Sequence, residues 1–177
     1  MAQPVNQSIE QMVKSAFSSG ERIIILGVGS SLNCDDGAGP AVAEKLINCM
    51  NGDFPENMRV YNGCASPENL TGEIKRFSPN TLIIIDAADF SGTPGSIKTI
   101  DMKNITGTGF SSHMLPVSIM ADYLEKETGC KTIMIGIQPA SILYGNELSE
   151  PVASTVRKIT KIMMKNIKKF SDQFQNG

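Results

Sequence analysis

The chain lacks the features that mark several broad classes of protein. Its formal net charge is −2 and its pI is near 5.4, so no excess of basic side chains is present to attract nucleic acid. No apolar run approaches the roughly 18 residues that a membrane-spanning helix needs, and we expect no membrane insertion. Residues 1–20 have neither a basic start nor a long apolar centre, which argues against a secretory signal.

Cysteine pairs and linkers are missing as well. The four cysteines are widely spread and form no C-x-x-C pair, which predicts reduced thiols in a cytoplasmic protein. A length of 177 residues without an internal repeat or linker predicts one domain over residues 1–177. Apolar residues at helical spacing between Ile9 and Phe17 predict that residues 1–20 form an N-terminal helical extension.

The first half of the chain alternates strand-like and helix-like segments. Apolar runs without alternation predict strands covered on both faces, and helix-spaced segments separate them, which favours a parallel sheet. The strands are expected to begin at Ile23, Met58 and Thr81. The connection over residues 87–95 is too short for a parallel crossover, so the fourth strand, residues 96–100, is expected to run antiparallel.

The second half continues with a Gly/Thr/Ser-rich loop over residues 104–112 and a helix over residues 112–126. A fifth strand is expected over residues 131–137, and a last helix from Pro151 with an apolar stripe reaching Phe170. The lysines of this helix are interpreted as its solvated face, because the total charge is slightly acidic.

Three residues at strand ends are candidates for chemistry. The strand from Ile23 breaks into small residues that carry Asp35 and Asp36, Asp86 closes the third strand, and His113 is the only histidine of the chain. Taken singly, Asp36 can be a helix cap, Asp86 a turn former and His113 a surface residue. Together they predict a site for a divalent transition metal with positions left for water or substrate, and nickel, zinc and manganese all remain open.

Two other chemistries are weaker interpretations of the same region. Gly27-x-Gly29 resembles a dinucleotide fingerprint, but Leu32 replaces the third glycine and two acids follow where a pyrophosphate would bind. A Cys34–His113 or serine hydrolase is the other alternative, yet no G-x-S-x-G motif is present and no basic residue lies near Cys34 in sequence. We therefore expect no covalent nucleophile.

The chain resembles the hydrogenase maturation endopeptidases, which trim the C-terminus of nickel–iron hydrogenase large subunits. The resemblance runs from Ile23 to the last helix and rests on six blocks in order, which are residues 27–40, 65–69, 85–89, 94–97, 112–116 and 136–139. It implies a three-layer α/β/α fold, of the phosphorylase/hydrolase-like kind, with a mixed five-stranded sheet of order 2-1-3-5-4. Its fourth strand would be antiparallel, in agreement with the loop-length argument.

The resemblance also implies the activity and the site. Asp36, Asp86 and His113 would be the catalytic residues and would bind nickel. This nickel would be supplied by the substrate, a hydrogenase large-subunit precursor, and other divalent ions would substitute for it in vitro. Cleavage would follow a histidine or arginine near the end of the precursor. The enzyme is expected to be a cytoplasmic monomer.

The chain differs from the family pattern at two points, and two alternative functions are considered beside this hypothesis. Family members usually have asparagine where Ser30 stands, and they tend to begin close to the first strand. One rival is a non-catalytic binding module or chaperone for the nickel-loaded precursor on the same fold. The other is a small-molecule hydrolase or phosphorylase, which should need cationic side chains near the strand ends, and the candidate loops have no lysine or arginine.

Overall fold

The computed structural model describes residues 5–17, 21–100 and 114–175. Five strands form one mixed sheet of order β2-β1-β3-β5-β4. The strands are β1 (Ile23–Val28), β2 (Met58–Cys64), β3 (Thr81–Ala87), β4 (Ile97–Ile100) and β5 (Lys131–Ile137). The pairs β1–β2, β1–β3 and β3–β5 are parallel and β4 is antiparallel to β5, which confirms the predicted fold class.

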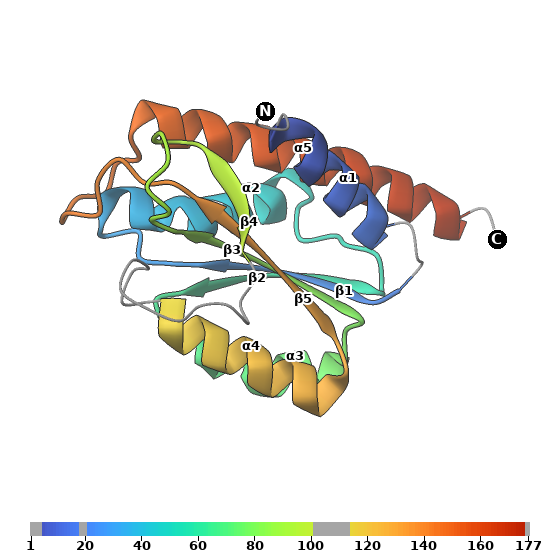
Figure 1. The fold of residues 1–177 in the computed structure, drawn as a ribbon. Coiled ribbons are helices and arrows are strands. Elements are labelled where there is room, and N and C mark those ends of the chain that lie inside the picture. Colours follow the sequence, from blue (N-terminus) through green and yellow to red (C-terminus); the bar gives the residue numbers. More distant parts are fainter. Residues whose placement is uncertain (1–4, 18–20, 101–113, 176–177) are drawn as a thin grey trace.

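Helices cover both faces of the sheet, so the molecule has three layers (Figure 1). One face carries α1 (Val5–Phe17), α2 (Ala38–Cys49) and α5 (Glu150–Gln175), and the other carries α3 (Thr71–Phe77) and α4 (Met114–Thr128). Two short 3-10 helices, η1 (Cys34–Gly37) and η2 (Pro67–Leu70), precede α2 and α3. Among the described residues, no helix combines the length and apolar character that crossing a bilayer requires.

The uninterrupted apolar runs of the central strands follow from this layering. Ile23 and Ile25 pack into the core under α1, α2 and α5, whereas Ile24 and Leu26 pack into the second core under α3 and α4. Strand β3 divides its side chains in the same way, and all seven of its residues are buried. A strand with a buried core on each face has no position for a polar side chain, unless that side chain has a special partner.

The N-terminal helix α1 packs against α5 and also touches the edge strand β4. Its apolar residues Ile9, Val13 and Phe17 are buried, and the Phe17 and Phe170 rings meet edge to face with centroids 5.7 Å apart. The extension therefore enlarges the core on the α2/α5 face.

Two helices are entered through short 3-10 turns. The turn η2 leads into α3, which starts at Thr71. The helix after β1 is likewise preceded by η1, and its N-cap is Gly37, which offers no side chain to the helix. Short 3-10 turns are common at helix entries, because they tighten the chain where the first amides have no helical partner.

Candidate active site

Three loops meet beyond the carboxyl ends of neighbouring parallel strands. Strands β1, β3 and β5 lie side by side, so the segments that follow them reach the same edge of the sheet (Figure 1). These segments are residues 29–37, 88–96 and 138–149. In open α/β sheets, ligands bind at this edge, where the strand order reverses.

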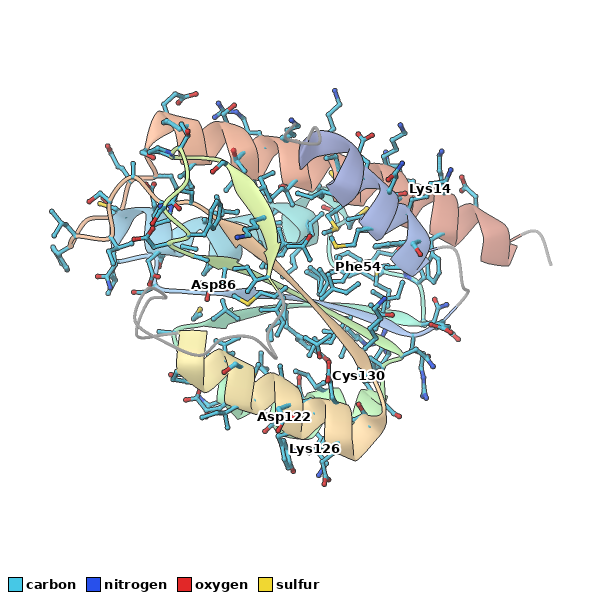
Figure 2. All side chains as sticks on the ribbon, in the orientation of Figure 1. Lys14, Phe54, Asp86, Asp122, Lys126 and Cys130 are labelled. Atoms are coloured by element: carbon cyan, nitrogen blue, oxygen red, sulfur yellow. The ribbon has the colours of Figure 1, made fainter. Side chains whose placement is uncertain are left out.

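Asp86 is a buried carboxyl group inside this edge. It is the next-to-last residue of β3, its side chain is 0% exposed, and neither carboxylate oxygen has a hydrogen-bond partner among the described residues. Figure 2 labels Asp86 toward the end of the sheet from which the β5–α5 loop projects. Burial, with the nearby Asp36 carboxylate second, raises the pKa of Asp86 well above its usual range. The adjacent Ala87 amide opposes this rise, although its geometry does not amount to a hydrogen bond.

Asp36 approaches Asp86 from the turn after β1. It lies in η1, is 3% exposed, and its Oδ2 accepts a hydrogen bond from the Ser30 amide at 2.8 Å. Gly29 separates the two acids: its φ is +129°, and an added Cβ would clash with the Asp36 carbonyl and lie 3.5 Å from Asp86 Oδ1. The helix-cap interpretation of Asp36 finds no support, since no side-chain bond caps α2.

The Ser30 departure leaves this contact intact. The bond to Asp36 comes from the backbone amide of Ser30, which any residue at that position supplies. The Ser30 hydroxyl instead accepts a long bond from the Leu32 amide, at 3.4 Å.

A cavity of about 150 Å³ opens beside Asp36. Ala87, Asp89 and Gln138 line it together with Asp36, and residues 139–142 form its rim. Three larger depressions lie elsewhere: two run along α5, with several of its lysines in their lining, and one lies at the starts of β3 and β5. We place the candidate active site at the smaller cavity, because among the described residues it is there that buried carboxyl groups meet the carboxyl ends of the strands.

Gln138 orders the wall of this cavity, and the residue-based sequence argument did not single it out. Its Oε1 accepts bonds from the Phe90 and Gly92 amides, both at 2.9 Å, and its Nε2 donates to Asp89 Oδ1 at 3.1 Å. The Ser91 amide, followed by the Gln138 side chain, lowers the pKa of Asp89. The only sequence signal for Gln138 was its place in one of the six blocks of the resemblance.

Asp35, the neighbour of Asp36, has a different role. It is 0% exposed and faces the β5–α5 loop. Its Oδ2 accepts bonds from the Ala140 and Ser141 amides and the Ser149 hydroxyl, and its Oδ1 accepts one from the Ser149 amide at 2.7 Å. A carboxylate with these four donors is a structural anchor. Of the two adjacent acids, Asp36 therefore remains as the candidate for chemistry.

His113, the third predicted site residue, lies outside the described residues, and so does all of the predicted loop 104–112 before it. The described residues include no cluster of three or more His, Cys, Asp or Glu side chains able to hold a metal ion. The described part of the predicted site therefore consists of Asp36 and Asp86. Helix α4, which follows His113, begins at Met114.

Comparison with known proteins decides the family. The sequence model of the HycI hydrogenase maturation protease family matches residues 40–166. The chain belongs to the hydrogenase maturation protease family. The match includes Asp86 and begins just after Asp36, so the place of Asp36 in the site rests on the geometry above.

Relatives of this family align along most of the chain. The hydrogenase 3 maturation protease of Escherichia coli K12 is 33% identical over 137 residues, which are 77% of this chain and 85% of that protein. A putative hydrogenase maturation protease of Methanocaldococcus jannaschii is 29% identical over 164 residues, which are 90% of this chain and 96% of that protein.

Solved structures agree with the observed fold. The NiFe hydrogenase maturation protease HycI of Thermococcus kodakarensis KOD1 superposes with a TM-score of 0.79 at 29% identity, over 89% of this chain and 99% of that one. The endopeptidase HycI of Escherichia coli gives 0.66 at 30% identity, over 78% of this chain and 86% of that one. This hydrogenase maturation protease is thus a hydrolase of the endopeptidase kind.

Proposed function

We propose that this maturation endopeptidase removes the C-terminal extension of a nickel–iron hydrogenase large-subunit precursor after nickel has been inserted. The nickel is part of the substrate and completes the site formed by Asp36, Asp86 and His113. The observation that carries the proposal is Asp86, a fully buried carboxyl group without a hydrogen-bond partner in the described part of the chain, beside a second acid and an open cavity. The family and its named relatives support the protein substrate.

The two acids fit a divalent cation. A buried carboxyl group without a hydrogen-bond partner destabilises a folded protein. Asp86 is therefore expected to have a partner that the described residues do not supply. A cation between Asp36 and Asp86 would offset both the burial and the mutual repulsion that raise the pKa of Asp86. Carboxylate oxygens together with an imidazole nitrogen suit first-row divalent ions, and this donor set binds Ni²⁺ more strongly than Mn²⁺.

The position of each acid suggests its role. Both acids are buried, and Asp86 is held by β3, so we assign it to holding the substrate's nickel. Asp36 lines the cavity, so we assign it the second role of accepting a proton from the water that attacks the scissile carbonyl. The nickel of the substrate supplies a Lewis acid beside that carbonyl. No covalent nucleophile is needed: the three loops contain no lysine or arginine to activate the Cys34 thiol, which lies against Gly145.

This arrangement explains why cleavage would wait for nickel. Two nearby acids have no electrostatic attraction for a substrate without a cation, and their own mutual repulsion is then not relieved, whereas a loaded precursor supplies the cation that completes the site. We therefore expect a precursor without nickel to remain uncut, and one loaded with nickel to be cut.

The test is a cleavage assay that follows the mass of purified loaded precursor. Asp36→Asn, Asp86→Asn and His113→Ala should each lower the rate by about 100-fold or more, because each removes a ligand or the base. Asp53→Asn, on an exposed turn, is the matched control and should cut normally. Normal cleavage by all three site variants would disprove the metal-site proposal. A wild-type protein that binds loaded precursor without cutting it would favour the non-catalytic binding module.

A further inference from the structure

Large apolar side chains gather at the rim of the candidate active site. Ile142, Leu143 and Tyr144 in the β5–α5 loop are 52%, 76% and 87% exposed, and Leu32 in the loop after β1 is 59% exposed. We call these four residues the apolar ridge. The other large apolar side chains exposed among the described residues, Ile119 and Tyr123, lie on α4. The loop that carries most of the ridge projects from the body of the molecule (Figure 1).

The backbone beneath the ridge is held firmly. The Gly145 amide donates to the Leu32 carbonyl at 2.8 Å, and the Cys34 amide donates to the Gly145 carbonyl at 2.6 Å, so the two loops form a short parallel bridge. The Asp35 carboxylate binds Ala140 and Ser149 at the two ends of the β5–α5 loop. The ridge side chains are thus exposed to water on an ordered backbone. Holding apolar side chains in water is unfavourable and adds nothing to the stability of the fold, and this arrangement is typical of binding surfaces.

The ridge is continuous with the catalytic cavity. Ile142 belongs to the ridge and also lines the cavity beside Asp36. Residues 139–146 carry no charged side chain, so this surface offers no electrostatic attraction and selects an apolar partner. A polypeptide whose scissile bond lies in the cavity can contact Ile142 and, beyond it, the rest of the ridge.

We propose that the apolar ridge binds an apolar segment of the precursor next to the scissile bond. This inference rests on the proposed function, because it takes the precursor as the polypeptide in the cavity. The ridge gives binding energy away from the reacting atoms, so it governs the affinity for the precursor and leaves the chemical step to Asp36 and Asp86. Aromatic and large aliphatic side chains at the centre of an interface commonly supply most of its affinity.

The experiment compares Leu143→Ser/Tyr144→Ser with the control Tyr123→Ser on α4. The ridge side chains are too exposed for their loss to unfold the protein, and circular dichroism verifies this. Cleavage is measured against precursor concentration. We expect the double variant to raise KM about tenfold or more with kcat within about twofold, and Tyr123→Ser to change neither. Unchanged KM, or a fall in kcat alone, would overturn the proposal.

Binding is measured separately, so that the two proposals can fail separately. In the Asp86→Asn background, which should not cleave, the ridge substitutions should weaken precursor binding by the same factor. If they do so while the wild-type protein cuts nothing, the proposed function fails and the ridge proposal stands. Sedimentation of the wild type and the ridge variant tests the alternative occupant: a dimer that the substitutions dissociate would assign the ridge to a second copy of this chain and overturn the proposal.

Discussion

At the scale of single residues, the two adjacent acids after β1 have different roles: Asp35 stabilises the structure and Asp36 belongs to the candidate active site. Asp35 points to the β5–α5 loop and its oxygens are filled by backbone and hydroxyl donors. Asp36 lines the cavity, takes one backbone bond, and lies near enough to Asp86 to raise its pKa. A buried carboxyl group with all its donors adds stability, whereas one without them reduces stability and is retained for a function.

The raised pKa of Asp86 leads to a prediction about the pH dependence of stability. Its pKa is raised in the folded state, so its contribution to stability is fully present below the ordinary carboxyl pKa and is lost as the pH rises through the raised value. In metal-free buffer, Asp86→Asn should therefore be more stable than the wild type near neutral pH. The difference should shrink as the pH falls toward about 4.

Urea unfolding at several pH values measures this effect. Asp53→Asn serves as the control, because that side chain is on an exposed turn and its loss should leave the pH dependence of the unfolding free energy unchanged. A neutral-pH stability of Asp86→Asn below that of the wild type would show that Asp86 has a stabilising partner.

At the scale of elements, one buried side chain joins three parts of the chain. Asp35 lies in η1, and its donors come from the loop after β5 and from Ser149, directly before α5. The Asp35 amide also donates to the Ser141 carbonyl at 3.0 Å. The position of the apolar ridge relative to the cavity thus depends on Asp35, the chain neighbour of Asp36, whose carboxylate binds the loop backbone and the Ser149 hydroxyl.

We therefore predict that Asp35→Asn lowers the free energy of unfolding by roughly 2–4 kcal/mol, because an amide group faces donors that need an acceptor. The measurement is urea unfolding followed by circular dichroism, with Asp53→Asn as the exposed control. The loop should also become more accessible to limited proteolysis near Tyr144. Wild-type stability in Asp35→Asn would mean that the four bonds contribute nothing net.

Sequence reasoning was accurate for elements because their signals are local. The continuous apolar run in β3 predicted a strand buried on both faces, and the nine-residue connection 87–95 predicted an antiparallel β4. The place of Asp86 at the end of β3 follows from the same pattern. The roles of Asp35 and Gln138 could not be predicted in this way, because the partners of their side chains, apart from the Pro139 carbonyl, lie 46 to 114 positions away along the chain.

At the scale of the whole molecule, one sheet supports two helix layers and two cores. Successive side chains of β1, β3 and β5 pack alternately into the α2/α5 core and the α3/α4 core. Neither core persists without the other, because each strand needs both of its covers. The helix α1 belongs to the first core through Phe17 and Phe170.

We predict a single cooperative unfolding transition for the chain. Tyrosine fluorescence reports largely on the α3/α4 side, since Tyr61 packs against that core and Tyr123 lies on α4, whereas far-ultraviolet circular dichroism includes the long helix α5. The two signals should give the same urea midpoint. Two separate midpoints would divide the chain into independent folding units.

The sequence by itself determined which segments become strands and helices, which strands are buried on both faces, and which connection must reverse direction. These properties follow from side-chain periodicity and chain length, which act over a few residues at a time. The tertiary structure decided that Asp36 comes close to Asp86, that Asp35 anchors a distant loop, and that Leu32 joins residues 142–144 beside the cavity. Such contacts exist only after strands far apart in sequence have aligned their ends at one edge of the sheet.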